Sequence, residues 1–190
     1  MGQQYNLLDD AQRRMLGGFR QAGISVVEAM IVVALIVILV LLALPTTMEW
    51  LANSRIRTAS ESMLAGMQLA RAEAVRRNDR VEFILNGGAA WTVQTVAGAL
   101  IQQRTAGEGT ADVVVTPTPN TATTVTFDGL GRRRANADAS NPVQQIDIDL
   151  PESILPADKT RNLRLQIGIG GQVLMCDPGV TDTTDVRICP

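Results

Sequence analysis

Residues 23–45 read Gly-Ile-Ser-Val-Val-Glu-Ala-Met-Ile-Val-Val-Ala-Leu-Ile-Val-Ile-Leu-Val-Leu-Leu-Ala-Leu-Pro, and this stretch decides the fold. Residues 24–44 form a run of 21 residues in which only one serine and Glu28 are polar. As an α-helix rising about 1.5 Å per residue, the run is roughly 30 Å long, which is the hydrocarbon thickness of a bilayer. We therefore predict a transmembrane helix over 24–44. A carboxylate near the end of an apolar helix is costly, so Glu28 is a candidate functional residue.

A short basic leader precedes this run. Residues 1–23 carry Arg13, Arg14 and Arg20, and the positive charge nearest the membrane predicts a cytoplasmic N-terminus. A conventional secretory signal is the alternative interpretation. It fits less well, because the apolar run is long and no small-x-small cleavage site precedes Pro45.

A basic leader, a glycine and a glutamate five residues after the glycine resemble the class III signal of type IV pilins and type II secretion pseudopilins. In that family a prepilin peptidase cuts after the glycine and methylates the new amine. The resemblance implies cleavage after Gly23, an N-methylated Ile24 as the mature N-terminus, and Glu28 as the fifth mature residue. Pro45 stands where pilins commonly carry a helix-loosening proline, so a helix break is expected there. The family usually has phenylalanine where this chain has Ile24, and this difference concerns the efficiency of methylation.

Glu28 has a physical role that follows from cleavage. The new ammonium at Ile24 would lie one helical turn from the Glu28 carboxylate, and opposite charges attract strongly at low dielectric. The pair can close within one subunit or between neighbours, and the resemblance implies that between neighbours it sets the axial register of assembly. The alternative is an ordinary single-pass anchor with a glutamate at the membrane interface.

Composition limits the function classes. The 190 residues suit one domain plus an extension, the net charge is −2, and removal of the leader leaves −3. A mildly acidic chain is not a general nucleic-acid binder. The chain has no histidine and a single lysine, Lys159, so it lacks the commonest metal ligand and general base. We expect no enzyme, no metal and no cofactor.

The helix is predicted to continue beyond the apolar run as an amphipathic segment over 45–78. Arg76 and Arg77 suit the negative end of a helix, and Asn78 suits its termination. One apolar stripe recurs at spacings of three and four residues, formed by Ile56, Ala59, Met63, Met67, Ala70 and Ala74.

Two stretches of this segment narrow the resemblance. Residues 50–59 read Trp-Leu-Ala-Asn-Ser-Arg-Ile-Arg-Thr-Ala, and residues 68–78 read Gln-Leu-Ala-Arg-Ala-Glu-Ala-Val-Arg-Arg-Asn. Both resemble the GspH/FimT branch of minor pilins and pseudopilins. The resemblance implies a periplasmic β-rich domain over 79–190.

The residues after the helix predict short β-strands separated by turn residues. Asn86-Gly87-Gly88 indicates a hairpin turn, and 105–124, rich in Thr, Gly and Pro, is expected to be an exposed, mobile connection. The fold class is therefore α+β, a long N-terminal pilin helix packed on a C-terminal antiparallel β-sheet domain. The predicted strands cover 81–85, 91–96, 99–103, 113–116, 123–127, 144–150, 163–169 and 172–175.

Cys176 and Cys189 are the two cysteines of the chain. A helix that enters the membrane with its N-terminus inside places the β domain outside the cytoplasm, where disulfides persist. A disulfide that closes a loop of this size stabilises by about 3 kcal/mol in the chain-entropy model. Two cysteines without histidine make a poor zinc site, and their spacing is not that of a redox pair.

One motif bears on nucleic acid. Some FimT-like proteins carry Gly-Arg-x-Arg before the C-terminal cysteine and are implicated in DNA uptake, but here Gln172 and Leu174 stand at the two arginine positions. A separate run of arginines, Arg132, Arg133 and Arg134, which we call the arginine stretch, is a candidate for contacts with phosphates. No aromatic neighbours offer base stacking, and a solvated turn is the alternative. A nucleic-acid partner is therefore not expected.

Together these features predict a minor pilin that primes or caps a type IV pilus. The alternatives are the equivalent subunit of a type II secretion pseudopilus and a DNA-receptor pilin. The expected partners are other pilins or pseudopilins, the prepilin peptidase and the bacterial inner membrane. The expected localisation is single-pass in that membrane, with the C-terminal domain in the periplasm until assembly.

Overall fold

Residues 25–107, 109–110 and 112–190 are described by a computed structural model. The leader residues, with Gly23 and Ile24, lie outside the described residues. The chain divides into two compact units, the first ending at Leu44 and the second spanning Pro45–Pro190.

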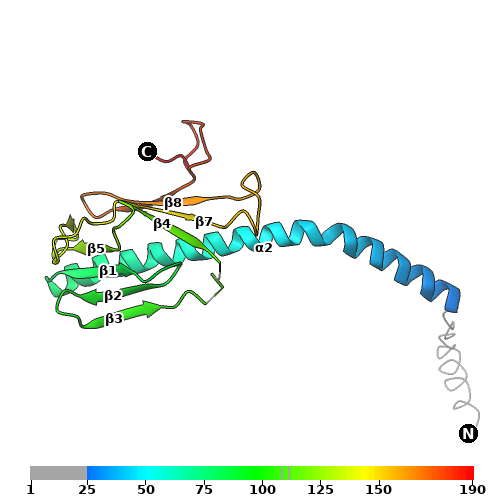
Figure 1. Ribbon diagram of the computed structural model, residues 1–190, viewed down its shortest axis with the longest axis horizontal. Helices are drawn as coiled ribbons and strands as arrows, with labels where there is room; N and C mark the ends of the chain where they lie inside the picture. The colour runs from blue at the N-terminus through cyan, green and yellow to red at the C-terminus, as the bar shows by residue number, and fades with distance from the viewer. Residues whose placement is uncertain (1–24, 108, 111) are drawn as a thin grey trace, which may run out of the picture. The chain divides into compact units, whose positions relative to one another are not determined.

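Helix α2 spans Val26–Arg77 and belongs to both units (Figure 1). At its start, the amide of Ala29 donates to the carbonyl of Ser25 (3.0 Å), and Glu28 falls in the first turn. Serine followed three residues later by glutamate has the spacing of a capping box, in which both side chains satisfy the free amides of a helix start. The helix ends at Arg77, and the next residue, Asn78, has a φ of +50°, a conformation that asparagine tolerates after the last turn.

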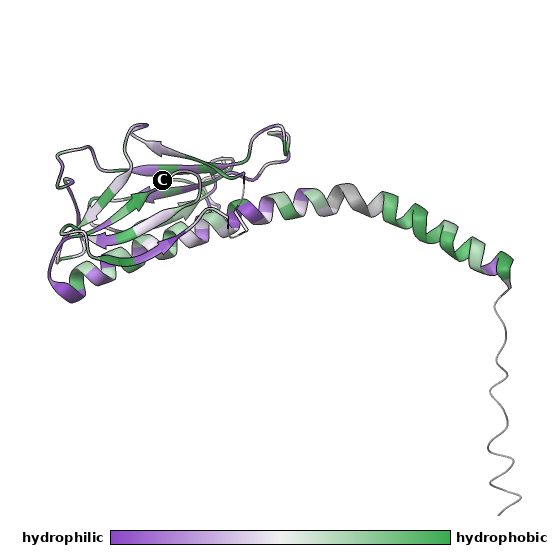
Figure 2. Cartoon of the chain, turned by 60° about the horizontal axis from the view of Figure 1, so that its bottom comes forward, coloured by the Kyte–Doolittle hydropathy of each residue, from purple (hydrophilic) through white to green (hydrophobic). Residues whose placement is uncertain are grey.

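The helix runs without interruption through Pro45, so the proline does not divide it into two helices. A local loosening at Pro45 stays a prediction. The described residues from Val26 to Leu41 are all exposed, and Figure 2 shows apolar residues along this part of α2. Within the described part of the chain, no helix meets the length and apolarity that crossing a membrane requires.

The second unit contains two antiparallel sheets (Figure 1). The first sheet has the order β3-β2-β1-β5-β6, and the second has the order β4-β7-β8-β9. The strands of the first sheet are β1 (Val81–Leu85), β2 (Trp91–Thr95), β3 (Leu100–Arg104), β5 (Thr124–Phe127) and β6 (Arg133–Arg134). Those of the second are β4 (Val114–Thr118), β7 (Gln145–Asp149), β8 (Leu163–Ile167) and β9 (Val173–Cys176).

Two parts of the predicted strand pattern need correction. The strand predicted at 113–116 is present as β4, which extends to Thr118 and pairs with β7 along five residues, so only part of 105–124 is a connection. The two-residue strand β6 was not predicted at all, because arginines carry no strand signal. It forms because Phe127 pairs with Arg133 across a tight turn. The predicted α+β class is confirmed.

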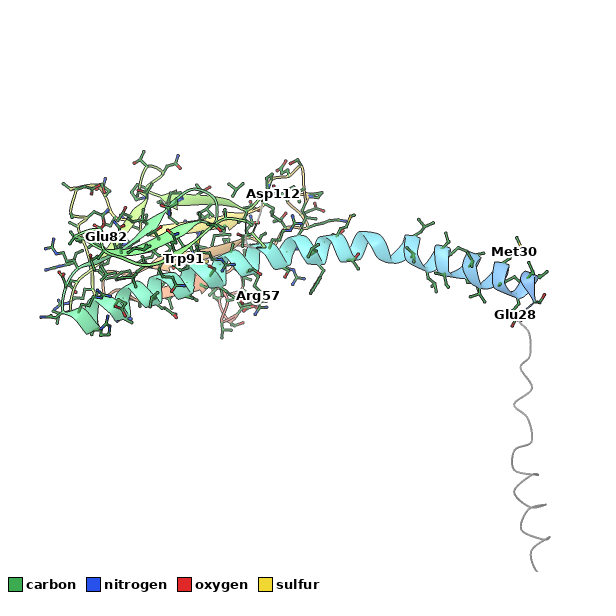
Figure 3. The ribbon with its side chains drawn as sticks, turned by 90° about the horizontal axis from the view of Figure 1, so that it is seen from below. Glu28, Met30, Arg57, Glu82, Trp91 and Asp112 are labelled. Atoms are coloured by element: carbon green, nitrogen blue, oxygen red, sulfur yellow. A yellow bond between two sulfur atoms is a disulfide. The ribbon has the colours of Figure 1, made fainter. Side chains whose placement is uncertain are left out.

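The apolar stripe of α2 forms the floor of the core. All six of its residues are fully buried, as the periodicity predicted. Gly66 permits the close approach of the first sheet, since a Cβ there would lie 2.9 Å from a ring carbon of Phe83. Beside it, the indole of Trp91 donates to the hydroxyl of Ser62 (2.9 Å), so a buried polar pair joins helix to sheet (Figure 3).

Candidate functional site

The first candidate is the N-terminal end of α2. Glu28 is exposed in the first turn of the helix, as Figure 3 shows. Its predicted partner, the amine of Ile24, and the predicted cleavage site at Gly23 both lie outside the described residues. Processing, methylation and the amine–carboxylate pair therefore stay predictions.

The second candidate is the arginine stretch, whose three side chains lie in different surroundings. Arg132 is exposed, and its backbone amide donates to Oδ1 of Asp128 (2.9 Å). Arg134 pairs with the same carboxylate, with Nε 3.2 Å from Oδ2. The pKa of Asp128 is lowered, first by the hydrogen bond from the Arg132 amide and less by the nearby guanidinium groups. This carboxylate offsets part of the positive charge at the turn.

Arg133 has a different role. Its Nη1 donates to the carbonyl of Ile167 in β8 at 2.8 Å and to that of Val143 at 3.3 Å. Arg133 belongs to the first sheet and Ile167 to the second, so this guanidinium connects the two sheets. Partial burial lowers the pKa of Arg133. The arginine stretch is therefore not a single cationic surface, because its central member is committed to protein carbonyls.

The arginine stretch lies beside the turn that contains Gly171 and Gln172, where the resemblance would place an arginine. The amide of Arg133 donates to the carbonyl of Ile169 (3.1 Å). A Cβ on Gly171 would lie 1.9 Å from the carbonyl oxygen of Gly131, so that backbone approach requires glycine. A neighbouring hollow of about 380 Å³ is lined by Arg133 and by glutamines, including Gln172. Gln172 and Leu174, which stand at the positions where the resemblance would place arginines, both line this hollow.

The C-terminal segment is closed by a disulfide between Cys176 and Cys189, as predicted. The amide of Asp177 donates to the carbonyl of Arg187 (2.8 Å), and the side-chain amide of Gln166 donates to the carbonyl of Pro190 (3.3 Å). These bonds hold the last residues beside β8. The sequence indicated the disulfide, but not the hydrogen bonds that accompany it.

Sequence reasoning missed a cleft next to this segment, which we call the Trp50 cleft. It has a volume of about 500 Å³ and lies between the helix and the second sheet of the same unit. Its lining residues are Trp50, Asn53, Ser54, Arg57, Arg161, Leu163, Met175, Cys176, Asp177 and Arg187. The available sequence signal was a tryptophan six residues after the apolar run, in a chain with 3% aromatic residues. The structure leaves its side chain 72% exposed.

Nothing in the described ranges suggests a metal centre. Across residues 25–107, 109–110 and 112–190, no group of three or more histidine, cysteine, aspartate or glutamate residues could hold a metal ion.

Comparison with solved structures finds the type IV minor pilin FimU of Pseudomonas aeruginosa in two crystal forms. The first is 15% identical, with a TM-score of 0.49, and the alignment covers 68% of this chain and 96% of that one. The second is 14% identical, with a TM-score of 0.47, and covers 66% of this chain and 99% of that one. None of the curated proteins matches. The family model described as Type II transport protein GspH matches residues 59–171, which is more than half of the chain. The resemblance predicted from the sequence is thereby confirmed, and the chain belongs to the GspH family, the GspH/FimT type of minor pilins and pseudopilins.

Proposed function

We propose that the chain is a minor pilin that helps prime or cap assembly of a type IV pilus. Before assembly, residues 24–44 hold it in the bacterial inner membrane, with the N-terminus in the cytoplasm and the second unit in the periplasm. The observation that supports this proposal is the start of α2, where a single carboxylate, Glu28, precedes exposed apolar residues in a chain of the GspH family. Family members of this type act by joining other pilins or pseudopilins, and this chain carries no catalytic or metal-ligand pattern in its sequence.

A type II secretion pseudopilin is the second candidate, and the description of the matching family model favours it. Both functions use the same fold and the same processing. Deletion and complementation separate them. Loss of surface pili with normal protein secretion would support the pilus function, and the reverse result would support the secretion function.

Processing is tested with Gly23→Ala. We expect the full-length precursor to accumulate, because the peptidase acts at the glycine that precedes the correctly spaced glutamate. Gly18→Ala is the matched control, since a cut after Gly18 would place Gly23 instead of a glutamate at the fifth mature position. An unchanged mature N-terminus at Ile24 in the Gly23→Ala protein would contradict the assignment.

Assembly is tested with Glu28→Ala. We expect this protein to be cleaved but poorly incorporated into sheared filament fractions, because the new amine loses its carboxylate partner. Glu61→Ala is the matched control, since Glu61 lies on the exposed face of the same helix and pairs with Arg57 (2.7 Å). Normal incorporation of the Glu28→Ala protein would show that the amine–carboxylate pair is dispensable.

A DNA-receptor function receives less support, because Arg133 is bonded to carbonyls and Arg134 to Asp128. Three phosphate contacts would give a slope of log affinity against log salt near −3 at most, at about 0.9 per phosphate. The net acidity of the chain opposes the approach of a polyanion. We expect no measurable duplex binding at physiological ionic strength. Binding that is lost when all three arginines become alanine would support DNA uptake instead.

A further inference from the structure

The second sheet ends at β9, whose outer edge lacks the features that usually protect a free strand. Proline, charged side chains, bulges and very short strands prevent unwanted pairing at the edges of natural sheets. Strand β4 carries Pro117, β3 ends in Arg104 and pairs through a register shift, and β6 consists of two arginines. Strand β9 reads Val-Leu-Met-Cys, and its Leu174 and Met175 are 49% and 37% exposed. The edge of β9 is therefore open to a further strand.

The main-chain groups that β9 leaves free follow from its pairing with β8. The amide of Gly168 donates to the carbonyl of Gln172 (2.9 Å), so these two residues begin the hydrogen-bonded ladder. Hydrogen-bonded pairs alternate with non-bonded pairs along antiparallel strands, and Val173 and Met175 stand at the non-bonded positions. Their amides and carbonyls therefore point away from β8, toward the open edge.

Two hydrogen bonds agree with this alternation. Ile167, which faces Val173 across the ladder, donates its amide to the carbonyl of Gln144 (2.8 Å) instead of to β9. Asp177, the next outward position after the strand, donates its amide to the carbonyl of Arg187 (2.8 Å). The C-terminal segment thus covers the edge at Asp177. The described residues offer no main-chain partner to the two outward positions before it.

The Trp50 cleft lies beside this edge. Met175 faces Leu165 across the ladder, and Leu165 is fully buried, so both side chains are on the core side of the sheet. Met175 lines the cleft together with Trp50 and Arg57 of α2, and Figure 3 labels Arg57 on that helix. Successive side chains of a strand point to opposite faces. In a strand added to β9, the side chain opposite Met175 would therefore enter the cleft.

The lining of the cleft defines the side chains that fit. Leu163 and Met175 contribute apolar surface and Trp50 is 72% exposed, so an apolar side chain gains by burial there. Arg161 adds a cation. It is exposed, and within the described part of the chain its side chain makes no hydrogen bond or ion pair, while its amide donates to Oδ1 of Asn53 (2.8 Å). Such a guanidinium suits a carboxylate, which it binds through charge-assisted hydrogen bonds.

The other charged groups of the lining have partners within the chain. Arg57 pairs with Glu61 (2.7 Å), and Arg187 pairs with Asp185 (2.6 Å). Asp177 interacts electrostatically with the Arg187 guanidinium and accepts an amide of its own turn (2.9 Å). These contacts leave the remaining guanidinium of the lining to a ligand.

The free main-chain groups identify the occupant as polypeptide, because an extended chain presents amides and carbonyls at the same repeat. We propose that β9 binds an extended segment of a neighbouring filament subunit as an added strand. This inference rests on the proposed function, since it takes the segment from another subunit of the filament. A second copy of this chain is a poorer match, because β3, β4, β6 and β9, the edge strands among the described residues, contain no carboxylate.

The geometry also gives the pattern of the bound segment. Arg161 precedes β8 and therefore lies toward the end of β9, beyond Met175. In an antiparallel arrangement, the segment has an apolar residue opposite Met175 and a carboxylate two residues earlier, on the same face, for Arg161.

The test places the photo-reactive amino acid benzoylphenylalanine at position 50 of the full chain, in cells that make the other filament subunits. We expect an adduct with one of those subunits. Mass spectrometry of the adduct should place the cross-link in a segment with the apolar and acidic pattern. The matched control position is 130, where Leu130 is 67% exposed in the turn between β5 and β6 and outside the cleft, and it should not give this adduct.

Strand pairing is tested with Met175→Pro, which removes an outward amide and suits an edge strand. Cross-linking from position 50 should fall roughly tenfold, the effect of one lost hydrogen bond on affinity. Met175→Ala keeps the amide and should retain most of the cross-linking. The disulfide between Cys176 and Cys189 should form in both proteins, which reports that they fold. Equal yields from the two proteins would overturn the added strand.

The charge contact is tested independently with Arg161→Glu. The adduct should be reduced, while Arg80→Glu, at an exposed arginine after the end of α2, should leave it unchanged. Replacing the partner's carboxylate by lysine, once the cross-link has located it, should restore the adduct of the Arg161→Glu protein. An Arg161→Glu protein that cross-links like the parent would overturn the carboxylate contact.

The remaining outcomes separate this inference from the proposed function. If the chain is present in sheared filaments but position 50 gives no adduct, or only an adduct between two copies of the chain, the added strand is refuted and the filament function stands. If the chain is absent from filaments and its deletion leaves pili intact, the proposed function itself fails.

Discussion

Replacement of Arg133 by methionine separates a structural role from a phosphate-binding role for the arginine stretch. The change removes the guanidinium and keeps most of the apolar side chain. A hydrogen bond from a charged donor contributes about 1.5 to 3 kcal/mol. Arg133 makes one short bond at 2.8 Å and one long bond at 3.3 Å, both from Nη1. The change also removes the free-energy cost of partly burying the guanidinium charge, which offsets part of the stability lost with the two hydrogen bonds. We expect the free energy of unfolding to fall by about 2 kcal/mol, with Arg132→Met, at an exposed side chain, changing it by about 0.5 kcal/mol or less.

The measurement is urea unfolding of the fragment Pro45–Pro190 followed by circular dichroism, with thermal unfolding as a second assay. For a domain of about 150 residues, 2 kcal/mol corresponds to a fall in Tm of about 4 to 8 °C. Arg134→Met should cost about 0 to 1 kcal/mol, because its ion pair with Asp128 lies at the surface. Equal stabilities of the Arg133→Met and Arg132→Met proteins would refute the connection between the sheets.

Three other predictions concern the second unit. Gly66→Val should destabilise it by about 2 kcal/mol or more in the same urea assay, because the added carbons collide with the rings of Phe83 and Trp91. Full stability of the Gly66→Val protein would contradict this packing. Replacing Cys176 and Cys189 by serine should cost about 3 kcal/mol, and free thiols found by mass spectrometry in the protein purified without reductant would rule out the bridge. The pKa of Glu73 is lowered to about 2 by hydrogen bonds from its two arginine partners, so its stabilising contribution is complete above about pH 4.5 and is lost as pH falls toward 2. Glu73→Gln should therefore flatten the stability profile between pH 5 and pH 2, and an unchanged slope would show that this carboxylate is not paired in solution.

The amino-acid sequence determined the features that depend on neighbours along the chain. The apolar stripe of α2 repeats every three or four residues, so its six buried positions were predictable from helical geometry alone. Strand β7 was predictable for the same kind of reason, since Ile146 and Ile148 alternate with aspartates on a period of two. The pairing of Cys176 with Cys189 followed from their being the two cysteines of a chain expected outside the cytoplasm.

Tertiary structure alone decided which distant segments meet. Nothing local in Arg133 indicates that its guanidinium will reach the carbonyl of Ile167, 34 residues later, and become a connection between sheets. The same holds for Gly131 and Gly171, whose backbones touch across two turns, and for Arg161, which Asn53 holds beside Trp50. Periodic patterns record which face of an element is buried, because side-chain direction follows backbone geometry. They do not record which buried faces pack together, since that choice depends on the shapes and hydrogen-bonding groups of residues far apart in the chain.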